Sequence, residues 1–367
     1  MDLGRCRELV GAISIFVLIL LVVEQASKAN QEHFGEPRSM SEVMALEPEE
    51  RNKWLKAAQD ELQSLVENGT FELVLLPSGH KAIGFRWVFW VKRNADGSIE
   101  CYKCCLTSIR AILALAALKD LELESVDISS AYLNGELKEE VYMCQPDGFE
   151  EKTPQWVWRL CKALYGLKQA GRCWHEKLDK VLNQLGFEQL TCKHSVWVYL
   201  CDGVRLIIPV FVDDITIAGK DKAVIQRVKD NLRKHFKLQD LGPTSWLLGV
   251  QIKHDHSKCS LSISQRQYAL DIVKRYGFSN YDPVSTHMDP GACLKPHTFL
   301  PAPCYIKGTL DYKLTYAPSP EPELFTSFTD ADHAGCPNTG RSTSGYVIKM
   351  GTGAISWSSC LQALVAD

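Results

Sequence analysis

The sequence predicts an α+β fold, in which helices back a largely antiparallel sheet. Two observations lead to this prediction. Apolar residues recur at helical spacing in several segments. Between these segments lie short runs rich in β-branched and aromatic residues, bounded by Gly, Asn or Asp, as is typical of strands.

The first helix is predicted to begin at Pro48, because proline is favoured at the first helical position. Apolar residues follow at helical spacing (Trp54, Ala58, Leu62 and Leu65), and the helix should end near residues 68–69. Strands are then predicted at residues 71–75, 84–92 and 98–102, with a hairpin turn at 94–97.

Four further helices are predicted from their apolar spacing and end signals, at residues 108–118, 169–185, 222–235 and 265–276. Gly186 would end the second of these, and the last two should expose basic faces. Between the first two helices, a short strand is expected to end at Asp127.

The run at residues 206–218 is apolar and β-branched on both sides of the adjacent acids Asp213 and Asp214. This pattern predicts two buried strands joined by a tight turn. A core does not tolerate two bare carboxylates, so the pair should lie at a turn or face a cation. Two interpretations remain open for this segment, a metal site and an ordinary surface turn.

Asp127 adds a third acid at the end of a neighbouring predicted strand, where it could meet Asp213. Three carboxylates on adjoining strand ends suit two Mg²⁺ ions about 4 Å apart, an arrangement that aligns a hydroxyl with a triphosphate. Mg²⁺ prefers such hard oxygen ligands.

Composition and charge fit a protein with more than one core. The 367 residues are 46% hydrophobic and carry a formal charge of −3, which argues against disorder and against a uniformly basic nucleic-acid binder. Charge is segregated, however, with four basic and nine acidic residues at 101–150 but twelve basic and five acidic at 219–280. The basic segment could contact a phosphate backbone or could form solvated helix faces.

Three motifs in this order carry a family resemblance: VDISSAYLNG at 126–135, LYGLKQAGRCW at 164–174 and FVDD at 211–214. With the segments at 54–103, 248–252, 262–277, 283–291 and 307–316, the chain resembles the reverse transcriptase of copia-type LTR retrotransposons. The segment at 328–359 resembles the opening of the RNase H domain tethered to it, so the resemblance covers most of residues 41–367.

The resemblance implies a right-hand polymerase of fingers, palm and thumb with an antiparallel palm sheet, followed by an incomplete RNase H-like segment. The reverse transcriptase domain would span residues 41–290, with an internal deletion near 103–106. Residues 291–316 would be a remnant of the connection, and residues 317–367 a truncated RNase H-like start.

The resemblance also implies roles for single residues. Asp127 and Asp213 would be ligands of two Mg²⁺ ions, with Mn²⁺ as a substitute, and Asp214 would support them as the third acid of the catalytic set. Tyr132 would lie under the incoming sugar and exclude a 2′-hydroxyl, unless it is a core tyrosine. Gln169 and Arg172 would be substrate-binding residues, with Gln169 near the nascent base pair.

The sequence departs from the family in several places. The basic finger segment that should grip the triphosphate is missing from residues 100–110, which predicts weak or absent polymerisation. Gly171 stands where proline is usual, so the helix start there should be looser. Asp330 matches the first RNase H carboxylate without its partners, so RNA cleavage is not expected.

The amino terminus carries a short apolar run at residues 10–23, after two arginines and before small residues at 26–29. This resembles a secretory signal peptide, and residues 1–30 are interpreted either as such a signal or as a spurious leader joined to a degraded element. The protein would be cytoplasmic or nuclear if the leader is spurious, and secreted or membrane-bound otherwise. No membrane contact is expected beyond this leader.

Cysteine and histidine groups give weaker signals. The fourteen cysteines lack the dense spacing of a disulfide scaffold, and the Cys-x-x-Cys at 101–104 has no second pair for zinc. His254, His256 and Cys259 flank a predicted hairpin turn, where a solvated loop is expected.

Three functions follow. The first is an RNA-directed DNA polymerase that acts by two-metal nucleotidyl transfer. Its substrates would be an RNA template, a DNA primer and deoxynucleoside triphosphates. This chain would be a degenerate copy, which a full-length element polyprotein could complement. The second is a non-catalytic remnant that folds or binds nucleic acid. The third, a secreted or membrane-anchored protein with a reused palm fold, depends only on the leader.

Overall fold

The computed structural model describes residues 37, 39–84, 87, 103–191, 193–201, 203–284, 301–320, 324–333 and 339–365. The predicted leader at residues 1–30, all of the predicted strand at 84–92 except residues 84 and 87, the strand at 98–102, the turn between these strands and the Cys-x-x-Cys side chains lie outside these described residues. All the strand pairs of the four sheets in the described part are antiparallel, in agreement with the predicted α+β class.

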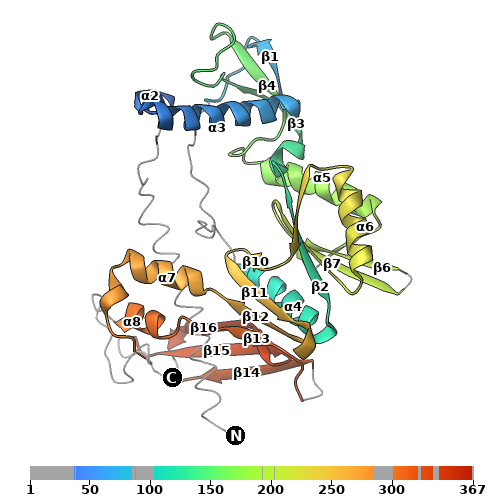
Figure 1. Ribbon diagram of the computed structural model, residues 1–367, viewed down its shortest axis with the longest axis vertical. Helices are drawn as coiled ribbons and strands as arrows, with labels where there is room; N and C mark the ends of the chain where they lie inside the picture. Colours follow the sequence, from blue (N-terminus) through green and yellow to red (C-terminus); the bar gives the residue numbers. More distant parts are fainter. Residues whose placement is uncertain are drawn as a thin grey trace.

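Helices α2 (Met40–Ala45) and α3 (Pro48–Glu67) pack with a small sheet at the top of Figure 1. This sheet has the order β1 (Phe71–Leu75), β4 (Trp156–Lys162), β3 (Glu136–Met143). The rings of Phe71 and Trp158 stack at 3.6 Å in its core, against Leu65 of α3. The predicted start of α3 at Pro48 and the bounds of β1 are confirmed.

A six-stranded sheet forms the centre of the molecule. Its strands are, in spatial order, β5 (Glu188–Leu190), β6 (Lys193–Cys201), β7 (Val204–Phe211), β8 (Asp214–Gly219), β2 (Glu122–Ile128) and β9 (Leu238–Pro243). Helices α5 (Ala170–Gln184) and α6 (Lys222–Arg233) pack on one face of this sheet. The alternation of strand side chains sends Ile215 and Ile217 of β8 into this core and Ala218 into the core on the other face.

The opposite face of the central sheet is covered by helix α4 (Lys103–Lys119) and a second, four-stranded sheet. This sheet runs β10 (Trp246–Leu247), β11 (Val250–Asp255), β12 (Ser260–Ser264), β13 (Leu314–Tyr316). Figure 1 shows α4 between this sheet and β2. The central sheet is therefore buried on both faces over part of its length, which explains why residues 206–218 are apolar almost throughout.

The C-terminal part holds helices α7 (Arg266–Arg275) and α8 (Pro301–Gly308) and a three-stranded sheet. That sheet has the order β14 (Phe325–Ala331), β15 (Arg341–Met350), β16 (Gly353–Val365). The guanidinium of Arg110 on α4 lies 4.0 Å above the ring of Trp357 on β16, and burial lowers the pKa of Arg110 to about 10. This cation–π contact joins the three-stranded sheet to α4.

The basic face predicted for residues 222–235 needs one correction. Lys229 points inward, with 1% of its side chain exposed, and pairs with Glu124 and Asp240. The helical spacing that buries Ile225, Val228 and Leu232 also places this lysine on the inner face, where acids from β2 and β9 neutralise it. None of the helices described combines the length and apolarity needed to cross a bilayer.

Candidate active site

Two carboxylates face each other at one end of the central sheet. Asp127 near the end of β2 lies directly opposite Asp214, the first residue of β8, in the antiparallel register. Both residues are half-buried. Directly opposite residues share a face of the sheet, with Cβ atoms about 5 Å apart. The sequence pointed to Asp213 as a neighbour of Asp127, and Asp213 lies in the turn directly before Asp214.

The turn between β7 and β8 fixes Asp213. Val212 before it has φ 54°, a left-handed conformation that β-branched residues avoid and that costs about 1–3 kcal/mol. Two hydrogen bonds hold the turn: Trp174 Nε1–H donates to the Val212 carbonyl at 2.7 Å, and the Ile128 N–H donates to the Asp213 carbonyl at 3.0 Å. Helix α5 and strand β2 thus both position this acid.

The segment after β2 is pressed against α5. It forms a short 3-10 helix, η1 (Ala131–Asn134), which is followed by Gly135. A Cβ at Gly135 would lie 2.8 Å from backbone atoms of both Cys173 and Trp174, so only glycine fits there. This close approach sets the position of η1 and of Tyr132 within it.

Two tyrosines approach the acidic turn. Partial burial and the Asp213 charge raise the pKa of Tyr132. Its ring lies 4.4 Å from that of Tyr165, and partial burial together with the Asp213 charge raises the pKa of Tyr165 to about 12. Both phenols therefore stay protonated at neutral pH and can donate hydrogen bonds. Tyr165 was not singled out from the sequence, although it lies within the LYGLKQAGRCW motif.

Gln169 and Arg172 lie at the start of α5. Gln169 is the residue that precedes the helix, is half-buried and has helical backbone angles. Arg172 is exposed and forms ion pairs with Glu139 at 3.7 Å and with Glu176 at 3.5 Å. The helix begins at Ala170 in spite of the glycine at position 171. The structure thus brings Tyr132 to the acidic turn, and it places Arg172 on an exposed face among carboxylates.

The acids suit a divalent cation by donor type and placement. Carboxylate oxygens are hard ligands of the kind that Mg²⁺ prefers, and Asp127 and Asp214 lie on directly opposite strand positions. The described residues contain one group of three or more potential ligands within 4.8 Å of one another, and it is a different one, considered below. Asp127, Asp213 and Asp214 would therefore need side-chain rotation to share an ion.

Asp330 lies on β14, far along the chain from these acids. It is exposed, opposes Gly345 in the register with β15, and accepts a hydrogen bond from the Ala331 N–H at 2.9 Å. The strand order β14, β15, β16 is a simple antiparallel meander.

The acids thus lie at one end of an antiparallel sheet that carries helices α5 and α6 on one face. The comparisons with known proteins identify the family of this domain. Residues 103–290 match the family described as "Reverse transcriptase (RNA-dependent DNA polymerase)", and the chain belongs to this family.

The relatives are Pol polyproteins of copia-type transposons. The chain is 33% identical to the Retrovirus-related Pol polyprotein from transposon TNT 1-94 of Nicotiana tabacum, over 90% of this chain and 31% of that protein. It is 31% identical to the corresponding protein from transposon RE1 of Arabidopsis thaliana, over 89% of this chain and 27% of that protein. A Transposon Ty1-MR1 Gag-Pol polyprotein of Saccharomyces cerevisiae is 33% identical over 40% of this chain and 8% of that protein. The chain thus spans less than a third of each of these relatives.

The alignment with the tobacco protein includes positions that this chain does not have. The match to the tobacco protein extends over 411 positions, which exceeds the 367 residues of this chain by 44. At least that many positions of the tobacco protein have no counterpart here.

Proposed function

We propose that this chain is the polymerase part of a copia-type RNA-directed DNA polymerase whose capacity to extend a primer is weak or absent. The observation that carries the proposal is the placement of Asp127 opposite Asp214, with Asp213 held beside them in a strained turn. Its substrates would be an RNA template, a DNA primer and deoxynucleoside triphosphates.

In this proposal Asp127, Asp213 and Asp214 hold two divalent ions, Mg²⁺ or Mn²⁺. The ions would supply charge neutralisation for the triphosphate and a more acidic primer hydroxyl. The primer 3′-oxygen would form a bond to the α-phosphorus while the bond from that phosphorus to the pyrophosphate oxygen breaks. The protein contributes positioning, and the fixed turn around Val212 keeps the acids in place before substrate arrives.

The two tyrosines would shape the sugar site. Tyr132 is proposed to lie under the deoxyribose and to exclude a 2′-hydroxyl by steric overlap. Tyr165 packs on its ring at 4.4 Å and would restrict its rotation, which makes that exclusion stricter. Gln169 at the start of α5 is proposed to lie near the nascent base pair, and Arg172 to contact substrate after exchanging its partners Glu139 and Glu176.

The basic segment at 219–280 would contact nucleic acid. Fewer of its basic side chains are available for phosphate contacts than its composition suggests. Five of its twelve basic residues form ion pairs with acids of this chain: Lys222, Lys229, Arg233, Lys258 and Arg266. Exposed residues such as Arg227 and Lys274 remain candidates for phosphate contacts. We therefore expect weak, salt-sensitive binding of template and primer.

The proposed loss of activity rests on the sequence between Tyr102 and Ser108, where the family's basic finger segment is missing. The excess of alignment positions in the relatives supports such an internal deletion. Without these side chains the triphosphate would lose charge-assisted hydrogen bonds, each worth about 1.5–3 kcal/mol, so a loss of two contacts would weaken binding by more than a hundredfold.

Metal binding tests the proposed site independently of catalysis. Mn²⁺ titrated into the full 367-residue chain should bind, as followed by the loss of its free signal in electron paramagnetic resonance. Asp127→Asn should reduce the affinity at least tenfold, because it removes one of the ligand carboxylates. Added Mg²⁺ should displace the Mn²⁺, since both prefer oxygen ligands.

Asp330→Asn is the matched control, because it removes the same charge from an exposed strand away from the proposed site. It should leave Mn²⁺ affinity unchanged. Equal affinities of the folded Asp127→Asn variant and the unaltered chain would exclude the proposed metal site.

A further inference from the structure

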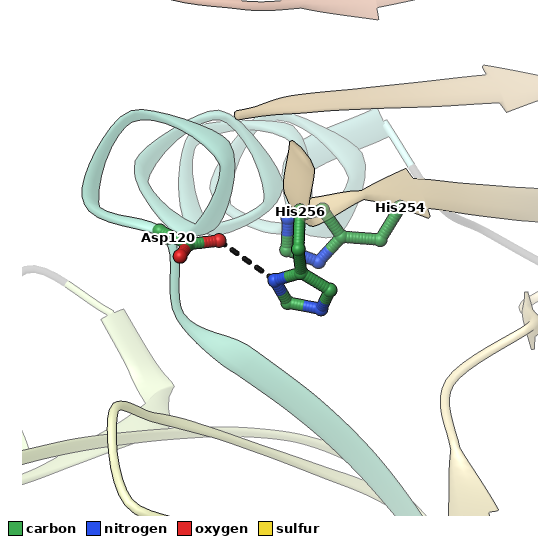
Figure 2. A group of neighbouring side chains, drawn as sticks. All are labelled: Asp120, His254 and His256. Atoms are coloured by element: carbon green, nitrogen blue, oxygen red, sulfur yellow. Dashed lines mark hydrogen bonds and ion pairs between the residues drawn. The ribbon is translucent and has the colours of Figure 1, made fainter. Parts of the chain in front are cut away.

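A second group of potential metal ligands lies at the other end of β2. Asp120 occupies the connection between α4 and β2, with φ 48°, and His254 and His256 lie at the end of β11 and the start of the following 3-10 turn, η2 (His256–Lys258). One ligand atom from each lies within 4.8 Å of the others. Figure 2 shows the two imidazoles side by side, with Asp120 next to His256.

The contacts within this group are short. His256 Nδ1 lies 2.7 Å from Asp120 Oδ1, and His256 Nε2 lies 3.5 Å from Glu122 Oε2. The two imidazole centroids are 3.9 Å apart. Glu122 also pairs with Lys222 at 3.2 Å, so it is shared between two basic groups.

His254 gives an independent indication of a ligand. Its Nε2 is shielded from solvent and has no hydrogen-bond partner in the described structure, and a buried polar atom of this kind calls for an explanation. An imidazole nitrogen without a hydrogen-bond partner is the kind of atom that can bind a metal ion.

We propose that Asp120, His254 and His256 form a binding site for a divalent transition metal ion, with Zn²⁺ the representative. Two imidazoles and a carboxylate are ligands that Zn²⁺ accepts, and the imidazoles select it over Mg²⁺. Glu122 or a water molecule supplies the fourth ligand. The sequence suggested Cys259 as a companion of these histidines, but its Sγ–H instead donates to the His256 carbonyl at 3.8 Å.

The geometry requires a small closure of the side chains. Ligand atoms around a tetrahedral Zn²⁺ lie roughly 3.3 Å apart, because each is about 2.0 Å from the ion. The existing separations are at most 4.8 Å, and rotation about side-chain bonds covers the difference. Side chains of Asp120 and His256 are 49% and 44% exposed, so an ion can reach the site from solvent.

The proposed site would join two parts of the fold. Asp120 and Glu122 belong to the connection that leads from α4 into β2, whereas the histidines belong to the four-stranded sheet. Glu122 is five residues from Asp127 along β2, or roughly 16 Å. Bound metal would thus fix β2 at the end opposite to the candidate active site, as a structural rather than a catalytic ion.

Zinc binding to the full chain, freed of metal by a chelator, tests this proposal. Titration calorimetry with ZnCl₂ should show a site that the double variant His254→Gln/His256→Gln weakens at least tenfold. The control His235→Gln removes an exposed histidine of the α6 end, and it should bind zinc like the unaltered chain. Thermal melts should rise by several degrees with Zn²⁺ and not with equimolar Mg²⁺, because binding to the folded state stabilises it.

A second readout requires no variant. Zn²⁺ should protect the exposed His256 of the unaltered chain from modification by diethylpyrocarbonate, as read by peptide mass spectrometry, while His235 stays reactive. This measurement also separates the site from zinc bound at cysteines elsewhere. Unprotected His256 in the zinc-loaded chain, or equal zinc affinity of the folded double variant, would overturn the proposal.

Discussion

The buried Lys229 gives the most quantitative prediction for the fold around β2. Its ammonium group lies 2.6 Å from Asp240 Oδ1 and pairs with Glu124, and only 1% of its side chain is exposed. Lys229→Met keeps most of the side-chain volume and removes the charge. Asp240 keeps Arg233 as a partner at 3.0 Å, whereas Glu124, which lies on β2, loses Lys229.

The magnitude follows from the burial of the remaining acid. Removing one partner of a buried ion pair destabilises a protein by about 3–5 kcal/mol, because the other charge is left uncompensated. Glu124 retains 15% exposure, so we expect about 2–4 kcal/mol for Lys229→Met. Because domains are stable by about 5–15 kcal/mol, this is a large fraction of the total.

Urea unfolding of the full chain, followed by tryptophan fluorescence, measures this effect. Lys222→Met is the matched control on the same helix, since its ion pair with Glu122 is at the surface and is worth about 0–1 kcal/mol. Adding Glu124→Gln to Lys229→Met should recover much of the loss, because no uncompensated charge then remains. A Lys229→Met variant as stable as Lys222→Met would refute the argument that burial makes the ion pair of Lys229 and Glu124 important for stability.

Three further predictions concern pH and the acidic turn. Burial alone would raise the pKa of Asp240, but hydrogen bonds from Lys229 and neighbouring groups outweigh it and lower the pKa. The ionised Asp240 therefore stabilises the folded protein, fully above the ordinary pKa of 3.8. This contribution is lost as the pH falls through the lowered pKa. Acid titration of stability should show a smaller loss below pH 3.8 in Lys229→Met. Gly135→Ala should destabilise the protein by about 2 kcal/mol or more, measured by thermal melting, because its Cβ would clash with the backbone of α5. Trp174→Phe should cost about 1–3 kcal/mol in urea unfolding, since it leaves the Val212 carbonyl without this donor.

Local signals in the sequence predicted much of the fold. Proline at the first helical position gave the start of α3, and the apolar runs on either side of the FVDD motif gave β7 and β8. The proximity of Asp127 to the acidic pair could also be expected, because both sit at ends of buried strands. The exact pairing could not be read from the sequence: the turn takes up Val212 and Asp213 and leaves Asp214 in the strand opposite Asp127.

Contacts between distant segments could not be predicted in this way. Lys229 has the same local pattern as an exposed helix residue, and its burial depends on acids that β2 and β9 place beneath it. Likewise, His254 and His256 were expected in a solvated loop, because nothing near them in sequence shows that Asp120 lies beside them. No sequence signal marked Tyr165 as a site residue, and the packing of its ring on Tyr132 shows that it lies at the candidate site.

Primer extension by the full 367-residue chain tests the central claim most directly. The assay would use an RNA template with an annealed DNA primer, in Mg²⁺ and in Mn²⁺, with Asp213→Asn as the control and circular dichroism to establish folding. The account predicts folded protein with weak or no extension. Robust extension that disappears in Asp213→Asn would contradict it, and would show that the finger segment proposed to be missing before Ser108 is dispensable.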